Sequence, residues 1–370
     1  MKLLNGSGMA AGFTVGMDPS GAERLVVAIK GTYSLPKRHG EEPKLAAEQV
    51  PLIDADLFSS EPGFSATLVE CDYALEKPRC DVLLNGAAYA SAGRPTQRVM
   101  VGLQIGNWRK SFVVLGDRVW RNAGVAYIAS QPVPFVRMPV SYDNAFGGTD
   151  DRLRDPVNYR QYPPNPVGRG WRYHRYPERI TNSPLPNTEE LDDPVRDPQG
   201  KYRPMAFGPI GRGWPPRIRY AGTYDQDWID NVFPFLPADF DTRYYQCAPE
   251  DQQIAAPQGG EHVILANLTL DGRREFPFPA VEMPIVFFRR RADRVETKGT
   301  IDTVLFEPEA ERFTVVWRAD LKLQRDIFEV SQLVVGKMSR AWWRSIETGK
   351  TYYPSLEAAV HEEAKEEEDA

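Results

Sequence analysis

The chain has 370 residues, of which 42% are hydrophobic and 26% are charged, a composition typical of a globular protein with a substantial core. The net charge of −6 belongs to the last 14 residues, EAAVHEEAKEEEDA, because the rest of the chain carries 44 basic and 44 acidic residues. A neutral body excludes general nucleic-acid binding, which requires a basic surface. No stretch approaches the ~18 apolar residues of a membrane span, so no membrane partner is expected.

The cysteines and the first residues indicate the compartment. Cys71, Cys80 and Cys247 form no CxxC pair and suggest no disulfide framework, which favours a reducing environment. The opening MKLLNGSGMAAGF lacks the sustained apolar core of a signal peptide. We therefore expect a cytoplasmic protein, unless another machine exports it.

Residues 1–130 read as a β-rich region. The run RLVVAIKGTYSL is rich in β-branched residues and is bounded by Gly21 and Pro36. Gly116 and Asp117 separate two short apolar runs, which predicts a hairpin at that point. Strands are expected over 24–35, 66–75, 81–90, 98–105, 110–115 and 119–121.

Residues 131–260 differ in character and read as a long insert. They contain twenty of the 32 prolines and 19 of the 41 aromatic residues. Disordered segments are poor in aromatics, so this composition predicts an irregular but ordered chain. Its most informative part, residues 207–253, contains no metal-ligand or catalytic spacing. A helix is expected over 225–232, capped by Thr223 and stopped by Pro234. We expect the 207–253 stretch to be mostly buried, including Trp228.

Residues 261–350 return to strand patterns, and residues 351–370 form an acidic tail. The tail contains few apolar residues, so it is expected to be dispensable for folding. The predicted fold is mainly β, with antiparallel sandwich- or barrel-like sheets, the Pro- and aromatic-rich insert and few short helices. The two strand-rich parts could be two β-domains or two halves of one structure. Strands are expected over 262–270, 285–290, 297–306, 312–323 and 329–337, and a terminal helix over 356–369.

Four carboxylates in the insert are candidates for chemistry. Asp225, Asp227, Asp239 and Asp241 could act as a general acid/base pair of a hydrolase or bind a hard cation. The first two also suit the positive end of a helix, and the last two lie in a turn-prone PADFD, so structural roles are favoured. The four histidines are far apart, which disfavours a zinc site.

Other motifs give little support for catalysis. The glycines of FGPIGRGW have the wrong spacing for a phosphate loop, and Pro215 and Pro216 should obstruct a following helix. Cys247 is expected to be buried and inert. The arginines of FFRRRADR are expected to pair with acids. We therefore expect no enzymatic activity and no metal or other cofactor.

Aromatic residues close to rigid turns could instead bind a partner or stack on sugars. Core packing is the alternative role, because large aromatic side chains are usually buried. The sequence leaves both roles open for Trp171, Tyr173, Trp214, Tyr224 and Trp228.

Three motifs carry a family resemblance. The run AGTYDQDWIDNVFPFLPADFDTRYYQCAPEDQQ at 221–253 resembles the signature of domain-of-unknown-function family 2169. YDNAFGG at 142–148 and NPVGRGW at 165–171 are similar to its accompanying motifs, and KGTYSL at 30–35 is similar to its opening. Proteins of this family resemble accessory factors of the bacterial type VI secretion system, encoded beside spike-trimer and PAAR-like tip genes.

The resemblance implies an adaptor or chaperone that holds a secreted effector, or its PAAR-like domain, and assists its loading onto the spike. The expected partners are the effector or PAAR-like tip protein, and the spike trimer. A carbohydrate-binding module and a hydrolase using the 225–241 carboxylates are the alternatives. The candidate partner-binding or signature residues are Phe146, Trp171, Trp214, Tyr224, Asp225, Trp228, Asp239, Phe240, Asp241, Arg243, Asp251 and Gln252.

Overall fold

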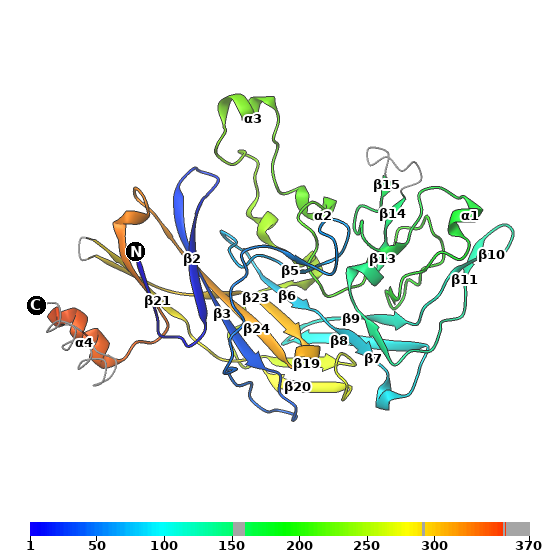
Figure 1. Cartoon of the computed structure of the whole chain (residues 1–370), viewed down its shortest axis with the longest axis horizontal. Helices are drawn as coiled ribbons and strands as arrows, with labels where there is room; N and C mark the ends of the chain where they lie inside the picture. Colours follow the sequence, from blue (N-terminus) through cyan, green and yellow to red (C-terminus); the bar gives the residue numbers. More distant parts are fainter. Residues whose placement is uncertain (151–159, 291–292, 351, 353–370) are drawn as a thin grey trace, which may run out of the picture.

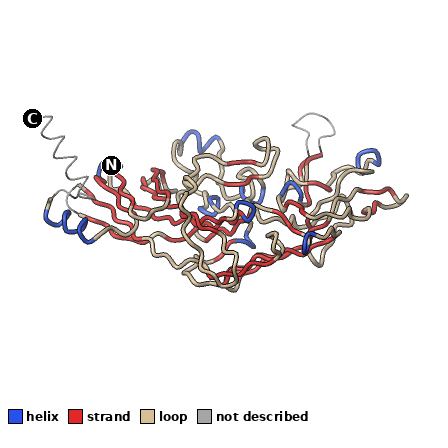
Figure 2. Tube along the Cα trace, turned by 60° about the horizontal axis from the view of Figure 1, so that its bottom comes forward, coloured by secondary structure: helices blue, strands red, loops and turns tan. Residues whose placement is uncertain are grey.

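The computed structural model describes residues 1–150, 160–290, 293–350 and 352. The mainly β fold expected from the sequence is confirmed, with three sheets of six, five and four strands and short helices. The helix expected over 356–369 lies outside the described residues. In Figure 2 the helices are short, separate pieces beside the strands.

The six-stranded sheet joins the two ends of the chain. Its longest ladder pairs β3 with β24 over eleven residue pairs, from Arg24↔Lys322 to Ser34↔Arg312. Apolar β-branched residues suit β3 because both of its faces are buried. Strands from the first and last thirds therefore lie side by side (Figure 1). The order is β18 (Gln253–Ile254), β6 (Cys80–Leu84), β23 (Thr300–Glu307), β24 (Arg312–Lys322), β3 (Glu23–Ser34) and β2 (Ala10–Met17).

The five-stranded sheet contains the hairpin formed by β8 and β9. β8 and β9 pair throughout their length and turn at Gly106-Asn107, where Gly106 adopts a φ of +55°. The hairpin expected around Gly116-Asp117 was wrong, because the outer edge of β9 pairs with β17. The order is β17 (Thr188–Glu189), β9 (Trp108–Leu115), β8 (Arg98–Ile105), β19 (His262–Ala266) and β20 (Arg273–Pro277).

The four-stranded sheet packs on the same core as the other two. One buried cluster includes Ile29 of the six-stranded sheet, Val263 of the five-stranded sheet and Leu333 of the four-stranded sheet. The strand-rich ends of the chain therefore share one hydrophobic core. The order is β1 (Lys2–Asn5), β25 (Val330–Val335), β21 (Pro284–Arg289) and β22 (Arg294–Lys298).

The insert is irregular, as expected, and its described strands are two or three residues long. Its aromatic residues form clusters apart from the main core, one of Phe146 and Trp171 together with the preceding Trp120 and another around Tyr142 and Trp214. Two-stranded pairs here and nearby are β10 (Trp120–Asn122) with β11 (Tyr127–Ala129), β7 (Ala87–Tyr89) with β12 (Arg137–Pro139), β13 (Phe146–Gly147) with β16 (Arg169–Gly170), β14 (Thr149–Asp150) with β15 (Arg160–Gln161), and β4 (Leu57–Phe58) with β5 (Thr67–Val69).

Several predicted elements are shorter or divided. The strand expected over 66–75 is reduced to β5, Gly86 separates β6 from β7, and Gly299 separates β22 from β23. The prolines at 215 and 216 do not obstruct a helix, because they occupy its first turn, where no amide donor is needed. The described α-helices are α1 (Pro177–Ile180), α2 (Pro215–Ile218), α3 (Gln226–Asn231) and α4 (Arg340–Thr348).

Candidate functional site

Residues 221–241 form a projection from the body, here called the arm, with α3 near its tip (Figure 1). The side chain of Asp225 accepts a hydrogen bond from the Trp228 amide at 3.0 Å and so caps α3. Thr223, the expected cap, instead binds Asp239. The helix itself was predicted to within one residue at each end, because its acids and the following Pro234 are local signals.

The arm is closed at its base by hydrogen bonds between its two strands of chain. The Asp241 amide donates to the Tyr220 carbonyl at 3.0 Å. Thr223 donates to both carboxylate oxygens of Asp239, from its amide at 2.9 Å and its hydroxyl at 2.8 Å. These two bonds lower the pKa of Asp239 below its ordinary value. The arm therefore has a fixed base rather than being a free loop.

The tip of the arm contains an aromatic cluster that is largely exposed. Trp228 packs edge-on against Tyr224 and Phe233, with ring centroids at 4.7 and 5.6 Å, and its indole N–H donates to the Phe235 carbonyl at 2.9 Å. Tyr224 is 50% exposed and Phe233 is 67% exposed. The expectation that this stretch is mostly buried was wrong for the arm, because its rings cover one another instead of the core.

Four exposed apolar side chains make up what we call the arm patch. Each is at least 45% exposed, and all four lie on α3 or directly beside it. An exposed apolar patch on a projecting element is a candidate interaction surface. The members are Tyr224, Ile229, Phe233 and Phe235.

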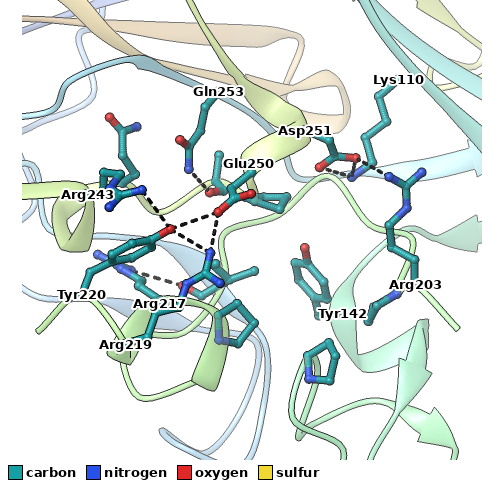
Figure 3. A pocket seen from close by; sticks show the side chains of 17 residues that line it. Lys110, Tyr142, Arg203, Arg217, Arg219, Tyr220, Arg243, Glu250, Asp251 and Gln253 are labelled. Atoms are coloured by element: carbon teal, nitrogen blue, oxygen red, sulfur yellow. Dashed lines mark hydrogen bonds and ion pairs between the residues drawn. The ribbon is translucent and has the colours of Figure 1, made fainter. Parts of the chain in front are cut away.

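A pocket of about 360 Å³ lies at the base of the arm (Figure 3). Arg219 and Tyr220, directly before the arm, and Arg243, directly after it, line the pocket wall. Its lining surface is mainly apolar, and the residues that line it include five cations and two carboxylates. The lining consists of Lys110, Tyr142, Pro164, Arg203, Pro204, Ile210, Pro216, Arg217, Arg219, Tyr220, Arg243, Gln246, Ala248, Pro249, Glu250, Asp251 and Gln253.

At one end of the pocket, two arginines hold Tyr220. The Arg219 and Arg243 guanidinium carbons lie 4.7 and 4.3 Å from the centre of its ring. Arg219 also pairs with Glu250 at 2.5 Å, and Arg243 pairs with Asp241 at 2.6 Å. The hydrogen bonds from Arg243 lower the pKa of Asp241. These contacts fix both ends of the arm to the same wall.

At the other end, Lys110 is buried beside two acceptors. Its ammonium lies 3.0 Å from Asp251 and 2.7 Å from the Gln252 amide oxygen. Burial lowers the pKa of Lys110 and raises that of Tyr142. The hydroxyl of Tyr142 points into the pocket (Figure 3), and no described residue hydrogen-bonds to it. This end could accept a polar ligand atom.

The sequence-predicted residues separate into two groups. Phe146, Trp171, Trp214 and Gln252 are buried and hold the fold. Cys247 is also buried, and burial raises the pKa of its thiol. The other candidates lie on the arm or at its base, namely Tyr224, Asp225, Trp228, Asp239, Phe240, Asp241, Arg243 and Asp251.

The carboxylates of the arm all have structural partners. Asp225 caps α3, Asp239 binds Thr223, and Asp241 pairs with Arg243, while Asp227 accepts from the Asn231 side chain at 2.7 Å. Among the described residues, no group of three or more His, Cys, Asp or Glu side chains could hold a metal ion. No helix within the described ranges is long and apolar enough to cross a membrane.

Sequence reasoning missed several elements, helix α4 among them, and two of the missed features bear on function. The pocket collects Lys110, Tyr142 and Arg203 from distant segments, so no local motif could indicate it. Strand β2 is the second, although its uncharged run AAGFTVGM between Gly and Asp residues was a usable signal.

The fold and the site define a β-rich protein from which a fixed arm with exposed apolar side chains projects. The chain belongs to the DUF2169 family, described as an uncharacterized protein conserved in bacteria, whose model matches residues 20–318. The family expected from the motifs is thereby confirmed, and the match includes the arm and the pocket. Comparison with curated proteins and with solved structures finds no match.

Proposed function

We propose that this protein is an accessory factor of a bacterial type VI secretion system. In this role it is a cytoplasmic adaptor or chaperone that binds an effector, or its PAAR-like domain, and assists loading onto the spike. The motifs at 142–148, 165–171 and 221–253 suggest the system, and the arm supplies a surface for the client.

The observation that supports this proposal best is the arm patch. Tyr224, Ile229, Phe233 and Phe235 are exposed apolar side chains on an element that stands away from the body. Burying them against a client would remove apolar area from water, which favours association. Because the base of the arm is held by Thr223–Asp239 hydrogen bonds, little ordering entropy would be lost on binding.

The alternatives fit the geometry less well. Sugar-binding platforms present flat rings, but Trp228 meets Tyr224 and Phe233 at interplanar angles of 73° and 88°. A hydrolase that used these carboxylates, as glycosidases do, would need two of them to converge, whereas those of the arm are committed to a helix cap, a turn and an ion pair. The adaptor therefore remains the function that we propose.

Co-expression with the products of the neighbouring effector and PAAR-like genes tests this function. We expect one of them to be more soluble with this protein and to co-elute in size exclusion at low and high salt, because apolar contacts are not screened. Ile229→Lys, which places a charge in the arm patch, should weaken the complex about tenfold or more, as expected for a central interface residue.

A matched control is available outside the arm. Ile128 lies on β11 and is 54% exposed, close to the 56% of Ile229. Ile128→Lys should leave binding unchanged. The adaptor function is contradicted if no neighbouring product co-elutes at either salt concentration. If Ile229→Lys and Ile128→Lys both bind the client as tightly as the unaltered protein does, the arm is not the binding surface.

A further inference from the structure

Strand β2 forms an edge of the six-stranded sheet and lacks the usual protection of an edge. Its eight residues, AAGFTVGM, include no charge and no proline, and its pairing with β3 is continuous from Ala10↔Lys30 to Met17↔Glu23, without a bulge. Long, flat, uncharged edges are templates for another strand.

Alternate residues of β2 form hydrogen bonds with β3, and this alternation shows which backbone groups of β2 face outward. The Asp18 amide donates to the Ala22 carbonyl at 3.0 Å, so even-numbered residues of β2 bond to β3. The amides and carbonyls of the odd-numbered residues therefore point away from β3. In the described part of the chain no strand pairs with this side of β2. The outward residues are Ala11, Phe13, Val15 and Met17.

The other edges of the three sheets are protected or short. β20 carries Arg273, Arg274 and Glu275 and ends in a proline, and β22 alternates charged residues with Val295 and Thr297. The remaining edges, β1, β17 and β18, have two to four residues. Among the described edges of these sheets, β2 is thus the one that is both long and uncharged.

The edge is also held firmly and lies beside the arm. Phe13 packs against the main core, while Tyr73 and Leu75 pack on the glycines of the opposite face. The ring of Phe235, a member of the arm patch, packs on Gly21 in the turn that follows β2. A partner seated on the arm patch would therefore reach the end of β2.

We propose that the β2 edge pairs with an extended strand of the client, an inference that rests on the adaptor function above. The open backbone groups require a β-strand as the occupant, because only an extended chain matches their spacing. The lack of charge on β2, together with the exposed Val15 and Met17, favours an uncharged strand with apolar side chains. Main-chain hydrogen bonds would hold this strand while the arm patch holds the client surface.

Val15→Pro tests the pairing because it removes an outward amide without removing a hydrogen bond to β3. Its control is Val15→Thr, which keeps the amide and the β-branched side chain. With the client identified by co-expression, we expect Val15→Pro to weaken binding about tenfold and Val15→Thr to leave it unchanged. Both variants should retain the circular dichroism spectrum of the unaltered protein.

Hydrogen exchange of the unaltered protein provides a second readout that does not depend on a variant folding. The client should slow exchange of the Ala11, Phe13, Val15 and Met17 amides. A blocked peptide of alternating Thr and Val with a Lys at each end should do the same at higher concentration. Its version with alternate amides methylated should not, because it cannot complete the ladder.

The possible failures are distinguishable. If Ile229→Lys weakens the complex while the four amides exchange as before, the edge proposal is overturned and the adaptor function stands. If no client is found and the peptide leaves the four amides unprotected, both fail. If sedimentation shows a dimer that Val15→Pro abolishes, the edge belongs to a second copy and the client-strand proposal is wrong.

Discussion

At the residue scale, a buried ion pair anchors the base of the arm. Arg217 of α2 is 1% exposed, and its guanidinium makes two hydrogen bonds to Glu70, at 2.5 and 2.9 Å. It also donates to the Tyr244 carbonyl at 2.7 Å. Removing one member of a buried pair leaves an uncompensated charge, which costs more than the pair itself contributes.

Glu70→Gln should therefore lower the free energy of unfolding by ~3–5 kcal/mol. The control is Glu190→Gln, whose partner Arg203 is exposed, with an expected loss of less than ~1 kcal/mol. Urea denaturation of both variants measures the difference. Equal losses would mean that the Arg217 pair is not a stabilising anchor.

Trp228 is a second residue-scale case, because its surroundings differ from those of a core tryptophan. It is half-buried and packs on the rings of Tyr224 and Phe233, whereas Trp317 is 1% exposed in the main core. Trp228→Ala should cost about 1–2 kcal/mol, from lost ring contacts and one hydrogen bond. Trp317→Ala should cost ~3–5 kcal/mol. Denaturant titrations that gave both variants the same loss would contradict this contrast.

At the scale of elements, the base of the arm should respond to acid. The pKa values of Asp239 and Asp241 are lowered from the ordinary 3.8, by hydrogen bonds from Thr223 and from Arg243. Groups with depressed pKa values stabilise the folded state above their ordinary pKa and lose that contribution as the pH falls through the folded-state value.

The Thr223 amide resonance should therefore titrate with a midpoint below 3.8. Asp239→Asn should abolish this titration, because an amide oxygen accepts the same hydrogen bond without ionising. A midpoint at or above 3.8 in the unaltered protein would show that the Thr223–Asp239 contact does not form in solution.

Sequence patterns identified the elements that depend on local signals. The β-branched run of β3, the hairpin partner β8 and the capped helix α3 were all found within one residue of their bounds. The pairing partners of strands were harder to predict, because nothing near Gly116 indicates that β9 pairs with the distant β17 rather than with the segment that follows the turn. The exposure of the arm was missed because aromatic rings can be covered by one another as well as by a core.

At the scale of the molecule, the interleaved sheets make the two ends of the chain interdependent. β3 lies between β2 and β24, and β8 lies between β9 and β19, so N-terminal strands depend on C-terminal ones. A fragment of residues 1–260 should therefore lack a cooperative unfolding transition.

Removal of residues 357–370, most of the acidic tail, should leave the melting temperature within a few degrees of that of the full chain. Thermal circular dichroism of both truncations tests this, and a cooperative transition in the 1–260 fragment would contradict it.

The β3–β24 pairing also affects how the chain folds during its synthesis. Ser34 pairs with Arg312, which leaves the ribosome 278 residues later. At a synthesis rate of ~5–20 residues per second, β24 emerges about 15–55 seconds after β3. During that interval the run from Leu25 to Ile29, fully buried in the finished protein, has one open edge. The nascent chain is thus most vulnerable to proteases and to aggregation before its last third emerges, and slower translation lengthens that exposure.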